Sequence, residues 1–325
     1  MRRRVARITL SLVLLAALGA ALFFWWRHDF YGPGPLEDPV SVMFEPGSGL
    51  RAIAKRLEAE GVIKGALFFA AGVSLLGHSR DLRAGEYLFD PKMSGYEVMD
   101  KLFRGEVVIR RVTLPEGLTS AEIARLIAAA EGLIGELPSE LPEGRFLPET
   151  YHYSRGDTRA AIVERMRRAM TETLDELWPA RAEDLPFASP EAALILASIV
   201  EKETGLPEER ARVAAVFVNR LRRSMPLQSD PTVVYALTGG AGPLGRPLTR
   251  DDLEVDSPYN TYRVPGLPPG PIANPGREAI AAVLHPAETN ELYFVATGDG
   301  GHAFAQTLEE HNRNVRRLRE RQAGD

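Results

Sequence analysis

The longest uncharged apolar run of the chain lies close to its N-terminus. Residues 8–26 contain no charged side chain, and as an α-helix they would rise about 28 Å, close to the ~30 Å hydrocarbon thickness of a bilayer. Arginines precede the run and two tryptophans end it (Arg2, Arg3, Arg4, Arg7; Trp25, Trp26). This pattern predicts a single-pass helix in the cell (inner) membrane, with a cytoplasmic N-terminus and an extracytoplasmic body. A cleaved signal peptide is the alternative, because residues 17–21 are mostly small, although the apolar run continues beyond them.

The pattern after this run predicts a small unit with two strands and two helices. Residues 28–39 are rich in Gly and Pro and predict a linker. A strand-like segment at 40–44 is followed by two segments with helical spacing, 50–61 and 64–76, and by a second strand-like segment at 82–89. The order β-α-α-β resembles a LysM-like module, a small fold that often holds glycan chains.

These segments together predict an α+β fold in four parts. Residues 1–27 form the N-terminus and the transmembrane helix, 28–39 the linker, 40–110 the LysM-like subdomain, and 111–325 a larger mixed α+β domain. Capping boxes mark two of the expected helix starts, at Ser94 with Glu97 and at Thr119 with Glu122.

Composition and charge narrow the classes of function. Hydrophobic residues make up 45% of the chain and charged residues 26%, and the absence of cysteine excludes disulfides, thiolate metal sites and a cysteine nucleophile. The first 27 residues hold five of the 39 Lys and Arg and no acid, which leaves 34 basic residues against 44 Asp and Glu. Such an acidic body argues against nucleic acid as a partner. The scattered histidines form no ligand pair and no phosphate loop is present, so we expect no metal and no cofactor.

Two glutamates end an otherwise apolar helix. Ser189 and Pro190 mark its start, and residues 192–200 carry no charge, so the helix should be buried on all sides. Glu201 and Glu203 follow, where desolvation raises the pKa of a carboxyl group. A carboxylic acid that stays protonated near neutral pH can act as general acid in the cleavage of a glycosidic bond. The alternative is that both glutamates merely end the helix.

The two glutamates lie about 200° apart around the helix, so they cannot face the same cleft. Glu201 shares a face with Ala197 and Ser198, small residues that would admit a substrate. Glu203 shares a face with Ile199, which is more typical of a core or of a structural ion pair. The spacing favours Glu201 without excluding Glu203.

Four motifs stand out in the second half of the chain. They are Ala-Ser-Ile-Val-Glu-Lys-Glu-Thr at 197–204, Leu-Gln-Ser-Asp-Pro-Thr-Val at 227–233, Ser-Pro-Tyr-Asn-Thr-Tyr at 257–262 and Gly-Leu-Pro-Pro-Gly-Pro-Ile-Ala-Asn-Pro-Gly at 266–276. Amides suit hydroxyl and N-acetyl groups and aromatic rings pack on sugar faces, so these motifs predict a carbohydrate groove, with plain tight loops as the alternative. In this order they resemble the endolytic murein transglycosylase family (YceG-like), from the apolar N-terminal segment to the C-terminus. Arg145 and Glu149 depart from the family pattern, which weakens any role for Glu149.

The resemblance implies a membrane-anchored lytic transglycosylase, with the catalytic domain over 111–325. Such an enzyme cleaves the bond between N-acetylmuramate and N-acetylglucosamine in nascent peptidoglycan strands and leaves a 1,6-anhydro-muramate end. The resemblance carries the role of general acid and then base over to Glu201. Substrate binding would fall to Gln228, Asp230, Tyr259 and Asn260.

The implied partners are the glycan strands and, as proteins, peptidoglycan synthases of the elongation or division machinery. Two alternatives stay open. One is a non-catalytic glycan-binding scaffold of the wall-synthesis machinery. The other is a muramidase in which Asp230 activates a water molecule, because hydrolysis normally needs a second carboxylate.

Overall fold

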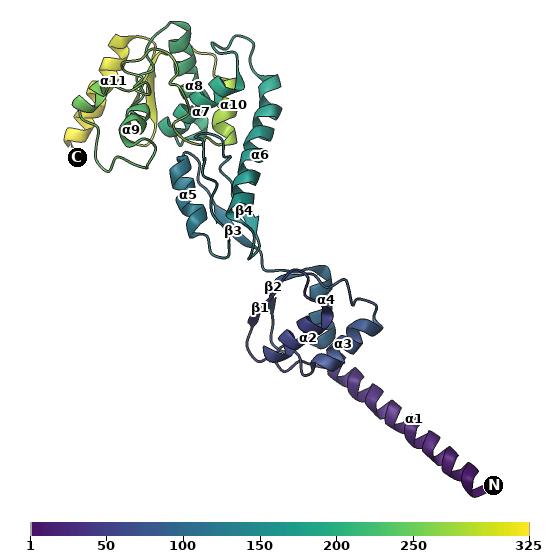
Figure 1. Cartoon of the computed structure of the whole chain (residues 1–325). Coiled ribbons are helices and arrows are strands. Elements are labelled where there is room, and N and C mark those ends of the chain that lie inside the picture. The colour runs from purple at the N-terminus through teal and green to yellow at the C-terminus, as the bar shows by residue number, and fades with distance from the viewer. Residues whose placement is uncertain (1, 325) are drawn as a thin grey trace. The chain divides into compact units, whose positions relative to one another are not determined.

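The computed structural model of the chain describes residues 2–324 (Figure 1). Two compact units are present: one holds the residues up to Arg110 together with Ser154–Gly156, and the other holds Arg111–Tyr153 and the residues from Asp157 onward. Within the described range, the strands form three two-stranded sheets, and the other regular elements are helices. The predicted α+β class is confirmed.

The first helix, α1 (Arg2–Tyr31), contains a segment, Thr9–Tyr31, that is long and apolar enough to cross a membrane by length and composition. The helix continues past residue 27, so the predicted linker is wrong over residues 28–31. Phe30 explains the difference, because its side chain is only 2% exposed and packs against Gly72 in the core of the first unit. A Cβ at Gly72 would lie 2.5 Å from the Phe30 ring, so glycine leaves the space that the ring fills.

The first unit is built on two antiparallel strands, β1 (Val40–Phe44) and β2 (Gly85–Phe89). The helices α2 (Leu50–Ala59) and α3 (Ala66–Leu75) lie between them in sequence, and α4 (Gly95–Arg104) follows. Val42 lies opposite Tyr87, and both side chains are buried in the core. The predicted β-α-α-β order and the capping box at the start of α4 are confirmed, whereas the likeness to LysM modules stays a prediction.

The second unit is mostly helical. From the boundary onward the chain forms β3 (Arg110–Thr113), α5 (Ser120–Ala129), β4 (Thr150–Tyr153), α6 (Arg159–Leu177), η1 (Trp178–Ala180), α7 (Pro190–Glu203), α8 (Pro207–Arg222), α9 (Asp230–Thr238), η2 (Asp251–Glu254), α10 (Arg277–Leu284), β5 (Tyr293–Ala296), β6 (His302–Ala305) and α11 (Leu308–Gly324). The predicted capping box at the start of α5 is confirmed.

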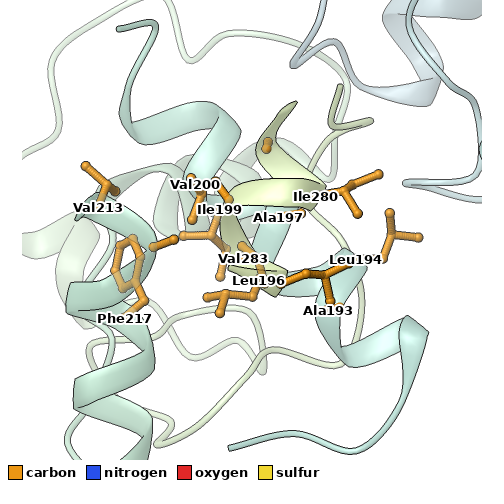
Figure 2. Close-up of a cluster of buried hydrophobic side chains, with 14 of the residues drawn as sticks. Ala193, Leu194, Leu196, Ala197, Ile199, Val200, Val213, Phe217, Ile280 and Val283 are labelled. Carbon is orange, nitrogen blue, oxygen red and sulfur yellow. The ribbon is translucent and has the colours of Figure 1, made fainter. Parts of the chain in front are cut away.

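Helix α7 runs through the core of this unit, as its uncharged sequence predicts. Figure 2 shows its side chains packed against those of α8 and α10, and the buried set is Ala193, Leu194, Leu196, Ala197, Ile199, Val200, Val213, Phe217, Ile280 and Val283. The helix begins as predicted, with Ser189 accepting a hydrogen bond from the Ala192 N–H and Pro190 at the first position. Because both neighbouring helices hold α7, its C-terminal end is fixed in place.

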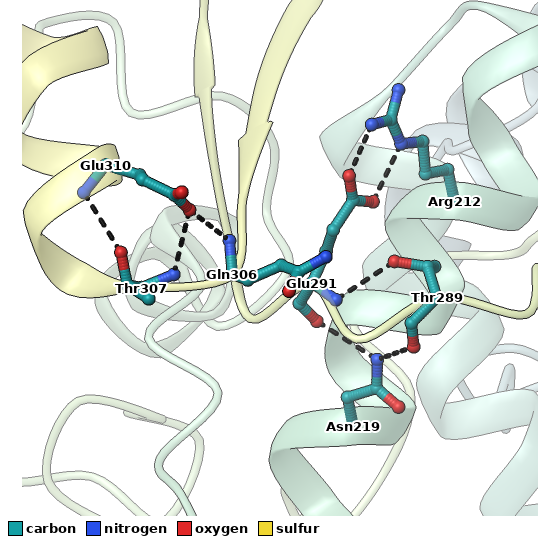
Figure 3. A network of polar contacts seen from close by, with 7 residues as sticks. All are labelled: Arg212, Asn219, Thr289, Glu291, Gln306, Thr307 and Glu310. Carbon is teal, nitrogen blue, oxygen red and sulfur yellow. Dashed lines mark hydrogen bonds and ion pairs between the residues drawn. The ribbon is translucent and has the colours of Figure 1, made fainter.

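A polar network ties the C-terminal elements to α8 (Figure 3). The Asn219 amide donates to the carbonyls of Thr289 and Glu291, and Arg212 forms a bidentate pair with the Glu291 carboxylate. Farther on, the Glu310 carboxylate accepts from the Gln306 and Thr307 N–H groups and caps α11. The network therefore fixes the β5–β6 hairpin and α11 beside α8, and α11 brings His311 to the cavity described next.

Candidate active site

Glu203, the last residue of α7, lies on the wall of a cavity of about 440 Å³. Polar residues around it are Arg220, Gln228, Asp230, Tyr262 and His311, and apolar walls come from Phe217, Leu227, Tyr293 and Phe294. These residues belong to α7, α8, α9, α11, β5 and the loops before α9 and after η2. The cavity therefore gathers segments spread over more than a hundred residues of sequence around one carboxyl group.

The electrostatics of Glu203 suit a proton donor. Burial raises the pKa of Glu203 to about 7, although a hydrogen bond from the Ser229 hydroxyl opposes the shift. That bond joins Ser229 Oγ to Glu203 Oε1 over 2.5 Å. The negative charge of Asp230 raises the pKa further, while His302 and Arg220 lower it. Near neutral pH the carboxyl group thus exchanges readily between its protonated and ionised forms.

Two of the predicted substrate-binding residues, Gln228 and Asp230, line this cavity. The Tyr262 hydroxyl donates to Asp230 Oδ1 over 2.6 Å, which orients the carboxylate at the start of α9. Gln228 is exposed and has a φ of +50°, a left-handed conformation that costs a non-glycine residue energy and often occurs at functional sites. Whether either residue binds substrate stays a prediction.

Glu201 lies elsewhere and is not among the residues that line the cavity. Its side chain is 5% exposed, and its Oε2 accepts from the Gly276 N–H over 2.9 Å. Gly276 is the N-cap of α10, so the carboxylate sits at the positive end of that helix. Burial raises the pKa of Glu201, and Arg210 lies 3.9 Å away. The Glu201 carboxylate thus joins α7 to α10, and its predicted role as the catalytic acid stays a prediction.

The other two predicted substrate-binding residues, Tyr259 and Asn260, are also outside the cavity lining. Asn260 is fully buried, and its amide donates to the carbonyls of Leu253 and Val255, both at 2.9 Å. Both N–H groups of the Asn260 side chain thus bind backbone carbonyls of its own loop. Tyr259 packs on Tyr235 with ring centroids 4.8 Å apart. Both residues shape the fold of the loop that carries Tyr262.

A second cavity of about 260 Å³ shares Asp230 with the first. Lys202, Pro231, Tyr235 and Ile272 also line it, and the Lys202 ammonium donates to the Gly117 carbonyl over 3.1 Å. Asp230 therefore stands between two hollows of the same unit.

The motif at 266–276 is held in place by the segment around Glu143. The Asn274 amide donates to Glu143 Oε1 over 2.9 Å, and the Phe146 N–H donates to Asn274 Oδ1 over 3.0 Å. Burial raises the pKa of Glu143, although the Ser120 N–H and hydroxyl donate to it. These bonds tie the loop at 266–276 to the start of α5.

Several residues of the cavity were not predicted as site residues. Tyr262 belongs to the motif at 257–262, whereas Arg220 and His311 lie outside the four motifs. His311 stacks on Tyr293 with centroids 5.3 Å apart. Local sequence patterns do not reveal these residues, because the tertiary contacts of α11 and β5 with α8 bring them to the cavity. Within residues 2–324, His, Asp and Glu side chains form no group of three or more that could hold a metal ion.

Comparison with known proteins places this chain in a family. Residues 42–317 match the YceG-like family, and the chain belongs to it. The endolytic murein transglycosylase of Bacillus subtilis is 33% identical over 305 residues, which cover 84% of this chain and 83% of that protein. The endolytic murein transglycosylase of Streptococcus pneumoniae serotype 2 is 30% identical over 357 residues, which cover 94% of this chain and 63% of that protein. A crystal structure of a YceG-like protein from Listeria monocytogenes is 32% identical, with a TM-score of 0.51, and the match covers 85% of this chain and 99% of that one.

Proposed function

We propose that this protein is a lytic transglycosylase that cleaves peptidoglycan strands with Glu203 as its general acid. The observation that carries the proposal is one carboxyl group, with a pKa of about 7, on the wall of a cavity rich in polar and aromatic side chains. Relatives at 30–33% identity are named endolytic murein transglycosylases, which supports the class of enzyme and of substrate. Burial therefore favours the protonated form that a general acid needs.

The proposed reaction uses Glu203 twice. Neutral Glu203 gives its proton to the oxygen that links N-acetylmuramate to N-acetylglucosamine, while the bond from muramate C1 to that oxygen breaks. The 2-acetamido group of the muramate stabilises the developing cation. The Glu203 carboxylate then takes the proton of the muramate 6-hydroxyl, whose oxygen bonds to C1 and closes a 1,6-anhydro ring. No water is consumed, so no second carboxylate is required to activate it.

The neighbours of Glu203 fit both halves of this cycle. The Ser229 hydroxyl donates to Oε1, which leaves Oε2 as the oxygen that carries and delivers the proton. The nearby positive charge of Arg220 favours the carboxylate that forms after proton transfer. In the proposal, Gln228 and Asp230, which line the same cavity, hold acetamido and hydroxyl groups of the sugar.

The N-terminal helix supports a place for this enzyme at the cell (inner) membrane. In the proposal, the uncharged part of α1, residues 8–26, crosses the bilayer once, with the N-terminus in the cytoplasm and both units on the extracytoplasmic side. The β-α-α-β unit would hold glycan strands as LysM-like modules do. Peptidoglycan synthases of the elongation or division machinery are the proposed protein partners.

The test compares two matched variants of the full-length protein, Glu203→Gln and Glu201→Gln, on purified glycan strands, with products weighed by mass spectrometry. We expect wild-type protein to release 1,6-anhydro ends and Glu203→Gln to lose at least 10²-fold in rate, since the group acts as both acid and base. Glu201→Gln should keep activity in its folded fraction. Loss of cleavage only in Glu201→Gln would return the role to Glu201, and the absence of cleavage by wild-type protein would favour the scaffold alternative.

A further inference from the structure

Helix α3 presents an apolar face that the first unit does not cover. Leu67 and Leu75 are 78% and 73% exposed, and Ala71 is exposed between them. These three residues are four apart in sequence, so they lie along one side of the helix. The opposite side, with Phe69 and Val73, is buried in the core of the unit.

The composition of α3 is unusual for a helix that faces water. Its sequence from Ala66 to Leu75 contains no charged residue, and the next residue, Leu76, is 38% exposed. A solvated helix normally carries charged or polar residues on its outer side. Charged residues instead flank the helix, with Lys64 just before it and Arg80 just after, both exposed.

The position of α3 is set by the end of the candidate membrane span. The Trp25 ring packs edge-on against Phe68 with centroids 4.8 Å apart, and the Trp26 indole N–H donates to the Phe68 carbonyl over 3.2 Å. Phe30, one turn farther along α1, contacts Phe69. Tryptophans at the end of a membrane span lie at the interface between hydrocarbon and water. These contacts therefore put α3 at the depth of the headgroups if α1 crosses the bilayer.

We propose that α3 lies at the membrane–water interface on the extracytoplasmic side of the cell (inner) membrane. Leu67, Ala71 and Leu75 would then lie among the lipid chains. The partner is the lipid bilayer itself, because Phe68, next to Leu67 on the same helix, packs on Trp25 at the end of the proposed membrane span. The flanking Lys64 and Arg80 meet the headgroups, and anionic lipids strengthen the contact. The first unit is thus seated directly on the membrane. The inference rests on the membrane-spanning role proposed for α1 and not on the identity of the catalytic acid.

The chain contains no cysteine, so single cysteines can report the surroundings of chosen positions. Full-length Leu75→Cys, labelled with an NBD fluorophore, is reconstituted in vesicles of phosphatidylcholine and phosphatidylglycerol. Quenching is measured with brominated acyl chains from the lipid side and with iodide from the water. Leu88→Cys is the matched control, because Leu88 is an exposed leucine (43%) on β2. Leu15→Cys on α1 is the control for insertion.

We expect the Leu75 label to be quenched by brominated lipid and to be several-fold less sensitive to iodide than the Leu88 label. Ala71→Cys, on the same face, should behave like Leu75→Cys and guards against a local effect of the substitution. Iodide quenching at Leu75 equal to that at Leu88 would overturn the proposal, as would protection from both quenchers, which indicates a covering protein surface such as a second copy. If brominated lipid quenches only the Leu15 label, α1 crosses the membrane but α3 does not contact lipid, which rejects the proposal. None of these readouts depends on glycan cleavage.

Discussion

Replacing Glu203 by Gln should stabilise the second unit at neutral and alkaline pH and leave it almost unchanged in acid. Burial raises the pKa of Glu203 from the ordinary 4.5 to about 7 in the folded protein. Below pH 4.5 the folded and unfolded chains both hold the proton, and no penalty arises. Between pH 4.5 and 7 only the unfolded chain releases it, so stability falls as the pH rises. At about 1.4 kcal/mol per pKa unit, the penalty above pH 7 is roughly 3 kcal/mol.

A glutamine at this position removes the penalty, because it stays neutral and its side-chain oxygen can still accept from Ser229. Urea unfolding at pH 4.5 and pH 8 measures the difference, with Trp25 and Trp26 changed to Phe so that Trp178 reports on the second unit alone. We expect Glu203→Gln to gain about 3 kcal/mol at pH 8 and close to nothing at pH 4.5.

The control is Ser189→Ala, which removes the N-cap at the other end of α7 and should lose about 1 kcal/mol equally at both pH values. A loss of stability in Glu203→Gln at pH 8, or the same gain at both pH values, would refute the reasoning. Either result would mean that Glu203 is not a desolvated acid in the folded protein.

Three further changes test individual residues. Ser229→Ala removes a hydrogen bond that lowers the pKa of Glu203, so the alkaline limb of the pH–rate profile for strand cleavage should move up by about one unit; an unmoved limb would disconnect Glu203 from the titration. Asn260→Ala should lower the free energy of unfolding by about 2–4 kcal/mol, because two partly buried carbonyls lose their donor, while KM of the folded enzyme stays constant; a raised KM would support the predicted binding role. Phe30→Ala should destabilise the first unit by about 3–5 kcal/mol in thermal unfolding and leave the Trp178 transition unchanged; an unchanged first unit would show that Phe30 is dispensable.

The elements that local patterns determine could be predicted well from the sequence. Helix α7 was predicted as buried because nine successive residues carry no charge, and its Ser-Pro start has the same local cause. The two capping boxes formed as expected, since they need only residues three apart. The order of strands and helices in the first unit follows from turn residues and helical spacing in the same way.

The features that local patterns do not determine depend on contacts between distant segments. Helical spacing can separate Glu201 from Glu203 only if one side of α7 faces solvent. Neighbouring segments instead pack against α7 on all sides. The cavity instead arises where the loop before α9 folds back over the end of α7 and brings Ser229 to Glu203, 26 residues away. The burial of Phe30 also depends on a distant segment, because its ring fills the space that Gly72 leaves.

In the proposed reaction, a single carboxylic acid cleaves the strand without using water. The most direct test is digestion of purified glycan strands by the full-length protein in water enriched in ¹⁸O, followed by mass spectrometry of the new ends. We predict 1,6-anhydro-muramate ends that contain no ¹⁸O, produced by wild-type protein and lost in Glu203→Gln. Reducing ends that carry ¹⁸O would contradict the account, because they would show hydrolysis and would make Asp230 the base that activates water.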